Sequence, residues 1–433
     1  MDKQQTPGLA RMLESATTHC NKCGFCLPFC PTYRETGQES ASPRGRLDLM
    51  LAVARGEVGL TRLRAPLEGC LGCLACTSAC PSGIPYGHWL EEARIDLRRN
   101  GQAPAVPLGG LLSHPRRLRL VLWLGWLFQR TGLRYVFGGA GLLRFVWPSL
   151  ARLERAGPLL PVPLPWRGKA RQWLAGGATA PTQGREVFLL TGCVMDAVFG
   201  PVHLATVKVL AKNGYRVRIP EGQGCCGALH LHGGDADSAR AMARVNIAAM
   251  EDAQNAPVLI NSAGCGAAMK DYGALLADDP QWAGRARAFS ARVRDISEFL
   301  AGEGITPPTT PLELKVAYDD PCHLSHGQGV RTQPRTLLEQ IPGLRLVSLP
   351  ESDWCCGSAG SFSVQQPEMA ARILARKMRH VSESGADVLA SGNPGCLLHL
   401  SKGVRQARLP TRVHHPIELL AMAYDQDGAK PAG

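Results

Sequence analysis

The stretch CNKCGFCLPFCP, residues 20–31, carries four cysteines at spacings of three, three and four positions and ends on Pro31. A second run with the same spacing, CLGCLACTSACP, occupies residues 70–81 and ends on Pro81. A C-x2-C-x2-C run lets one tight loop place thiolates on three corners of an iron–sulfur cube, and the fourth corner needs a cysteine from elsewhere. The two runs therefore predict two 4Fe-4S clusters.

In proteins with two such clusters, the fourth cysteine of each C-x2-C-x2-C-x3-C-P run binds the other cluster. The same exchange predicts two ligand sets, which are Cys20, Cys23, Cys26 and Cys80 for cluster 1 and Cys30, Cys70, Cys73 and Cys76 for cluster 2. It ties both runs into one ferredoxin-type module over residues 1–100. A pair of zinc sites is the alternative, but zinc usually takes two separated C-x2-C pairs.

The length and the cysteine content set the broad class of the chain. A chain of 433 residues is long enough for two or three domains. Its sixteen cysteines are far above the average number for a protein of this length. The first twenty residues contain no apolar segment of the kind a signal peptide requires. We therefore expect a reducing cytoplasm, where grouped cysteines are more often metal ligands or catalytic thiols than disulfides.

The stretch PRGRLDLMLAVARGEV, residues 43–58, looks helical and lies between the two cysteine runs. It is longer than a minimal two-cluster module needs, so we expect the module to be rich in helix. Arg44 and Arg46 within it either offset the negative charge of a cluster or are ordinary solvated residues.

Residues 101–183 form a connecting segment of different character. Between residues 101 and 172 there are eleven Arg or Lys against one acid, Glu154, which is +10 of the formal +12 of the whole chain, together with Trp123, Trp126, Trp147 and Trp166. Basic residues among Trp and Leu favour an interfacial helix on an anionic membrane surface. An alternative of equal weight is that the leucines of this segment pack on a partner subunit and its arginines lie in water. Nucleic-acid binding is a third option without a recognition motif.

The longest apolar run, LRLVLWLGWLF at residues 118–128, is eleven residues long and contains an arginine. A membrane span needs about twenty predominantly apolar residues. The sequence therefore predicts no transmembrane helix, and the expected location is the cytoplasm, with peripheral contact to the inner membrane as an option.

The C-terminal half contains a repeat that its cysteines reveal. Cys193, Cys225, Cys226 and Cys265 recur as Cys322, Cys355, Cys356 and Cys396, at offsets of 129, 130, 130 and 131 positions. A nearly constant offset indicates two copies of one unit, which we place at residues 184–310 and 311–425. Strand-like segments alternate with helical ones in each copy, so the sequence predicts two parallel α/β units after a helical module.

Each cysteine of the repeats is expected just after a strand or at the start of a helix. Ligands in open α/β sheets sit beyond the carboxyl ends of the strands, and helix N-termini lower the pKa of thiols. The glycine after each Cys-Cys pair suits a positive φ or a close approach. These eight cysteines are therefore candidate ligands of a further cluster, and the plain alternative is that they are buried, inert core residues.

The paired cysteine runs, the two CCG units and the phrases CPTY, SPRGR, CPSG, GCCGA, SAGCGA and CCGSAG resemble the iron–sulfur subunit of bacterial glycolate oxidase, over nearly the whole chain. The resemblance implies two 4Fe-4S clusters, a FAD-containing partner that oxidises the 2-hydroxy acid, and electrons passed on towards a quinone. Iron–sulfur subunits of glycerol 3-phosphate and lactate dehydrogenase systems share much of this pattern and remain alternatives.

The CCG units also resemble those of the heterodisulfide reductase catalytic subunit, where each full motif ends in C-x2-C. Here Ala268 and His399 stand where the last cysteine would be. The resemblance to a catalytic reductase is therefore incomplete, although His399 could replace a thiolate through a ring nitrogen. An ordinary helical histidine is the alternative, and His323 beside Cys322 raises the same choice.

Two functions follow from these patterns. The first is an electron-transfer subunit with no catalytic residue of its own, and the second is a reductase that breaks a disulfide at the CCG units. The missing terminal cysteines favour the first. Oxidation of a 2-hydroxy acid removes two electrons together, and an iron–sulfur cube accepts one at a time, so a flavin is expected on another subunit.

Overall fold

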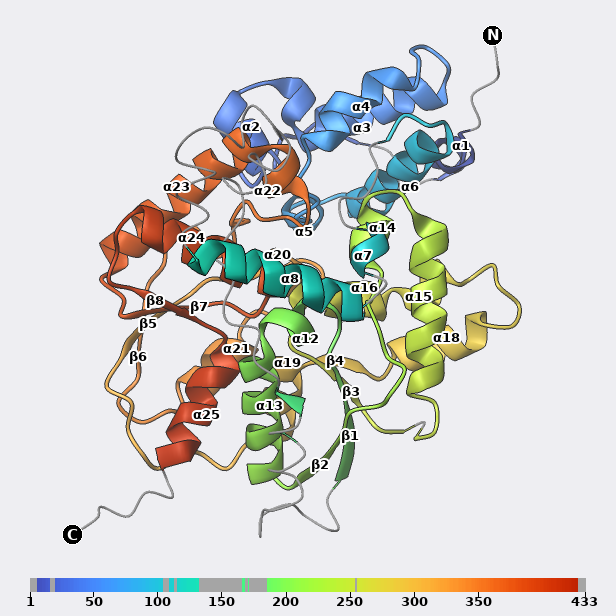
Figure 1. Cartoon of the computed structure of the whole chain (residues 1–433). Coiled ribbons are helices and arrows are strands. Elements are labelled where there is room, and N and C mark those ends of the chain that lie inside the picture. Colours follow the sequence, from blue (N-terminus) through green and yellow to red (C-terminus); the bar gives the residue numbers. More distant parts are fainter. Residues whose placement is uncertain are drawn as a thin grey trace, which may run out of the picture.

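The computed structural model describes residues 6–15, 20–103, 109–112, 115–131, 166–167, 170, 185–253 and 255–426. A helical N-terminal part lies against two parallel sheets that stand next to each other (Figure 1). The predicted fold class, a helical module followed by two α/β repeats, is confirmed.

The N-terminal part is built of short helices around its own core. They are α1 (Pro7–Glu14), α2 (Pro31–Thr36), the 3-10 helix η2 (Glu39–Ala41), α3 (Pro43–Ala54), α4 (Thr61–Glu68), α5 (Ala75–Ser78) and α6 (Tyr86–Arg99). Prolines begin α1, α2 and α3, where a missing N–H costs nothing. Ser42 caps α3 by accepting the Gly45 amide at 3.0 Å. The helical stretch expected at residues 43–58 is therefore present, ending at Ala54.

The first repeat contains a four-stranded parallel sheet with the strand order β2-β1-β3-β4. Its strands are β1 (Arg185–Leu190), β2 (Tyr215–Arg218), β3 (Val258–Ile260) and β4 (Val293–Asp295). Its helices are α12 (Val194–Val198), α13 (Gly200–Lys212), α14 (Ala228–His232), α15 (Ala236–Ala249), α16 (Ala263–Lys270), α17 (Tyr272–Leu275), α18 (Ala283–Ser290) and α19 (Ile296–Glu303).

The second repeat has the corresponding order, β6-β5-β7-β8, again with all strands parallel. Its strands are β5 (Lys315–Tyr318), β6 (Arg345–Val347), β7 (Val388–Ala390) and β8 (Arg412–His414). Its helices are α20 (Cys322–Ser325), α21 (Gln333–Leu338), α22 (Phe362–Gln365), α23 (Pro367–Ser384), α24 (Pro394–Gln406) and α25 (Pro416–Gln426). The matching strand orders agree with the repeat that the cysteine spacing predicts.

The two repeats share one hydrophobic core and meet at their cysteine-bearing loops. Buried side chains of both repeats, such as Leu210 and Leu420, belong to the same cluster. At the junction, the Asn393 side-chain oxygen accepts the Gly264 amide at 3.2 Å, and the Gly392 carbonyl accepts the Ala263 amide at 3.1 Å. The carboxyl ends of both sheets therefore face a common region.

Helices α7 (Gly109–Leu112) and α8 (Pro115–Arg130) represent the connecting segment, and α8 crosses in front of the repeats (Figure 1). Leu118 of α8 packs with Cys193 and Cys225, while Asp196 pairs with Arg119 and with Arg167. Two of the basic residues of this segment, Arg119 and Arg167, therefore form ion pairs within the chain. Trp147 and most of the segment after residue 131 lie outside the described residues. No helix in the described part of the chain is long and apolar enough to span a membrane.

Candidate iron–sulfur sites

The four cysteines predicted for cluster 2 come together from two separate loops. Cys30 is the residue before α2, Cys70 and Cys73 lie between α4 and α5, and Cys76 lies in α5. All four are buried and line one small cavity, together with Arg46 and Tyr86. The exchange of the fourth cysteine between the runs is therefore geometrically possible, because Cys30 lies beside the second run.

Arg46 is a buried cation at this cavity, with only 2% of its surface exposed. Its guanidinium donates to the carbonyls of Pro66 at 2.8 Å and Gly69 at 3.0 Å and to the Thr32 hydroxyl at 3.1 Å. Burial acts to raise the pKa of Cys70, but Arg46 and then Arg94 bring that pKa below its ordinary value. The interpretation of Arg46 as a solvated residue is therefore wrong, and its charge can offset a negative cluster.

Arg44, two positions earlier, behaves differently. It pairs with Glu39 at 2.6 Å on the surface and donates to the Lys22 carbonyl at 3.3 Å, within the first cysteine run. Arg44 is thus a partly exposed residue, as the alternative interpretation of the sequence has it.

The cysteines predicted for cluster 1 are less enclosed. Cys20, Cys26 and Cys80 are half-buried and pack on the core of the N-terminal module, whereas Cys23 is exposed. The Asn21 side chain donates to the Ser82 hydroxyl at 3.3 Å, so residues next to Cys20 and Cys80 lie together.

In the first repeat, four thiols form a buried chain. Cys193 Sγ donates to Cys225 Sγ at 3.5 Å, and Cys226 interacts with both Cys225 and Cys265. Hydrogen bonds from Cys193 and Cys226 lower the pKa of Cys225 to about 3. The hydrogen bond from Cys226 likewise lowers the pKa of Cys265.

The second repeat repeats this arrangement with Cys322, Cys355, Cys356 and Cys396, in that order. Hydrogen bonds within the group, and then burial, raise the pKa of Cys355, Cys356 and Cys396 well above the ordinary value. In these three thiols, neighbouring thiols and burial thus shift the pKa in the direction opposite to that expected from helix N-termini. A bound metal would displace such protons.

The glycines after the Cys-Cys pairs have the role the sequence predicts. Gly227 has φ +82° and Gly357 has φ +92°. A Cβ on Gly227 would lie 3.0 Å from Ala239 Cα, and one on Gly357 would lie 2.9 Å from the Ala370 carbonyl. Both positions therefore need glycine for conformation and for space. Gly227 directly precedes α14, whereas Gly357 lies in a loop five residues before α22, so the second pair is not at a helix start.

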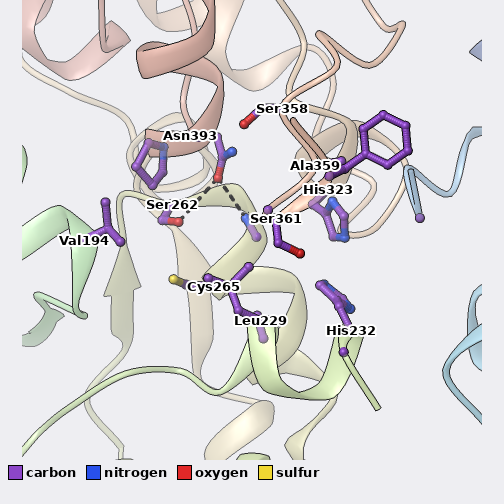
Figure 2. Close-up of a pocket in the computed structure, with 18 of the residues that line it drawn as sticks. Val194, Leu229, His232, Ser262, Cys265, His323, Ser358, Ala359, Ser361 and Asn393 are labelled. Atoms are coloured by element: carbon purple, nitrogen blue, oxygen red, sulfur yellow. Dashed lines mark hydrogen bonds between the residues drawn. The ribbon is translucent and has the colours of Figure 1, made fainter. Parts of the chain in front are cut away.

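All eight repeat cysteines line one central cavity of about 390 Å³. Figure 2 shows side chains of both repeats around it, with Leu229, His232 and Cys265 on one side and His323 and Ser361 on the other. The sequence predicts two separate cysteine groups, but their convergence on one space depends on how the repeats pack. No group of three or more His, Cys, Asp or Glu in the described ranges has the spacing for a single metal ion.

The N-terminal module reaches this cavity through its second cysteine run. Cys70 lines both the small cavity and the central one. Cys73 packs in one buried cluster with Cys355 and Cys322 of the second repeat. Burial raises the pKa of Cys73 well above its ordinary value, and the nearby Cys355 raises it further. Thiols of the module and of the second repeat thus lie in the same buried cluster.

These features define an iron–sulfur protein in which a two-cluster module is joined to a pair of cysteine-rich α/β domains. Residues 16–84 match the 4Fe-4S dicluster domain family, residues 187–270 and 316–401 match the CCG cysteine-rich domain family, and residues 106–156 match the linker region of the glycolate oxidase iron–sulfur subunit.

Full-length relatives agree with the domain matches. The chain is 38% identical to the "Probable glycolate oxidase iron-sulfur subunit" of Bacillus subtilis (strain 168), over 95% of each chain. It is 30% identical to the glycolate oxidase iron–sulfur subunit of Escherichia coli (strain K12), over 96% of this chain and 97% of that one. Lactate utilization protein A of Geobacillus kaustophilus is 31% identical, over 54% of this chain and 98% of its own length. The chain belongs to the family of glycolate oxidase iron–sulfur subunits.

Proposed function

We propose that this chain is the electron-transfer subunit of a glycolate-oxidising complex. A FAD-containing partner would oxidise glycolate to glyoxylate, and the chain would carry the electrons towards a quinone or another membrane acceptor. A 4Fe-4S cluster, when bound, accepts and releases one electron at a time. The observation that carries the proposal is the contact of Cys73 with Cys355 and Cys322, because it joins the module to the central cavity.

The proposal assigns the ligands within the units 1–100, 184–310 and 311–425. Cluster 1 would be held by Cys20, Cys23, Cys26 and Cys80, and cluster 2 by Cys30, Cys70, Cys73 and Cys76. The donor set supports the second assignment, since four buried thiols and a buried arginine surround one small cavity. The repeat cysteines would hold further iron–sulfur centres, one group being Cys193, Cys225, Cys226 and Cys265 and the other Cys322, Cys355, Cys356 and Cys396.

An iron count tests the assignment. Anaerobically prepared protein is expected to hold more than the about eight irons that two cubes need. Cys225→Ser and Cys355→Ser should each remove only iron above that number, because both residues lie outside the N-terminal module. If the protein holds about eight irons and neither substitution changes that number, only the N-terminal module binds clusters.

We also propose that α8 contacts an anionic membrane surface. Its outer face exposes Leu120, Val121, Trp123 and Leu124, with 57%, 46%, 45% and 50% of their surfaces accessible. An apolar face next to arginines is typical of a helix that lies in the interface. Packing of the same face on the flavoprotein partner is the alternative.

Membrane attachment of this kind should depend on salt. Binding to vesicles with anionic lipid is expected to fall when the salt rises from about 0.05 to 0.5 M, since screening weakens arginine–headgroup attraction. Cosedimentation measures it, and Trp123→Ser with Leu124→Ser should weaken it further. If the protein never binds vesicles, or binds equally at all salt concentrations, the face belongs to subunit packing.

A further inference from the structure

His399 lies among the cysteines of the second repeat. It is on α24, three residues after Cys396, so the two side chains share a face of the helix. Only 6% of its surface is exposed, and it lines the central cavity with the four cysteines of that repeat. His399 therefore lines the same part of the central cavity as these four thiols.

One ring nitrogen of His399 is buried without a partner. Among the described residues, Nε2 makes no hydrogen bond of normal geometry, although the Ala370 carbonyl lies close enough to interact with the ring. It faces the loop of the Cys-Cys pair, because a Cβ on Gly357 would lie 3.4 Å from it. Leaving a buried polar atom unpaired costs about 1–3 kcal/mol, so its persistence needs an explanation.

Within the described part of the chain, His230 of the first repeat also has a buried nitrogen without a partner, Nδ1, but His399 is the one of the two that lines the central cavity. Two other buried histidines of the repeats have both nitrogens paired. His203 hydrogen-bonds the Thr191 carbonyl at 3.1 Å and the Asn261 side chain at 3.2 Å. His415 contacts the Asn261 carbonyl at 3.2 Å and accepts the Ile417 amide at 3.2 Å. These histidines are structural, and the open nitrogen of His399 is a different case.

The first repeat has no counterpart of this donor. Ala268 stands three residues after Cys265, on helix α16, at the place that corresponds to His399. The two cysteine groups are otherwise alike in order and burial. The second repeat therefore offers four thiols and one imidazole nitrogen, whereas the corresponding position of the first offers only a methyl group.

We propose that His399 Nε2 is a ligand to one iron of an iron–sulfur centre that is held by Cys322, Cys355, Cys356 and Cys396. The inference rests on the proposed function, because it requires that these cysteines bind an iron–sulfur centre. Imidazole is a good ligand for iron, and replacing thiolate by histidine at an iron–sulfur centre raises its reduction potential.

His323 is the competing candidate. Its Nδ1 lies 3.5 Å from Cys322 Sγ, close enough for a hydrogen bond to sulfur. A hydrogen bond of this kind tunes a centre without binding iron. Substitutions at His399 and at His323 therefore distinguish a histidine that binds iron from one that only hydrogen-bonds a cysteine.

Pulsed EPR on protein labelled with ¹⁵N-histidine tests the proposal. The reduced second-repeat centre should show a strong histidine nitrogen coupling, which His399→Ala and His399→Cys abolish and His323→Gln preserves. His399→Cys should retain the iron and lower the reduction potential, because a thiolate replaces the nitrogen. This variant keeps the test valid if His399→Ala loses the centre or fails to fold.

The outcomes separate the ligand from the function. If iron above about eight per chain is present but the coupling is absent, or is lost only in His323→Gln, then His399 is not a ligand while the proposed centre stands. If no iron above that number is found, both this proposal and the cluster assignment of the repeats are wrong. Iron content and nitrogen coupling therefore report on different claims.

Discussion

Cys73→Ser is expected to remove about four irons and to stop electron flow from the N-terminal module to the central cavity. Cys73 is buried with Cys30, Cys70 and Cys76 around one cavity, and serine is a poor substitute for a thiolate there. Cys73 also packs against Cys355, so its loss interrupts the junction between the module and the second repeat. Iron analysis and the rate at which the clusters are reoxidised by an added acceptor measure the two effects.

Cys23→Ser provides the matched comparison. It should also remove about four irons, because it belongs to the other proposed ligand set. Its loop is exposed, and so the junction at Cys73 and the fold of the repeats should be unchanged. A Cys73→Ser protein that retains its full iron content would show that Cys73 is not a cluster ligand.

The second large effect concerns the support of the second Cys-Cys loop. Lys377 on α23 pairs with Asp319 at 2.9 Å, and only 2% of each side chain is exposed. The same ammonium donates to the carbonyls of Glu351 at 2.7 Å and Ser352 at 3.1 Å. Lys377 therefore joins the end of β5 to the loop that leads into Cys355.

Lys377→Met is expected to lower the free energy of unfolding by about 3–5 kcal/mol, because it leaves the Asp319 carboxylate buried without its partner. The iron bound by the second repeat should fall with it, since the loop before Cys355 loses its anchor. Urea unfolding followed by circular dichroism measures the stability of the α/β repeats.

Two further variants locate the cause. Arg379→Met, on the exposed side of the same helix, should change the free energy of unfolding by less than about 0.5 kcal/mol. Asp319→Asn added to Lys377→Met should recover part of the loss, because it removes the unpaired charge. A loss below about 1 kcal/mol for Lys377→Met would contradict the role given to this pair.

The sequence predicts the architecture where local pattern decides it. The offset of the cysteines identifies the two repeats, and alternating strand and helix segments predict two parallel sheets. Strands β4 and β8, with the sequences VRD and RVH, are missed because each is three residues long and has no clear apolar pattern. They form because a neighbouring strand offers an open edge.

The candidate sites are predicted in their composition but not in their assembly. The spacing predicts the ligand runs, yet the burial of Arg46 depends on carbonyls of Pro66 and Gly69, which only the folded module brings near. The shared cavity likewise depends on the packing of one repeat on the other. Such long-range contacts leave no periodic signal in the sequence.

The central claim is that this chain transfers electrons and does not oxidise the substrate. Oxidation of a 2-hydroxy acid removes two electrons together, whereas an iron–sulfur cluster accepts one at a time, so a flavin has to stand between them. We therefore expect the flavin on the partner subunit.

Anaerobic addition of glycolate, with and without the flavoprotein partner, tests this claim most directly. With the partner present, glycolate should bleach the iron–sulfur absorbance of this chain and produce the EPR signal of reduced clusters. Without the partner, the absorbance should not change. Oxidation of glycolate by this chain alone would contradict the account, as would reduction by lactate or glycerol 3-phosphate but never by glycolate.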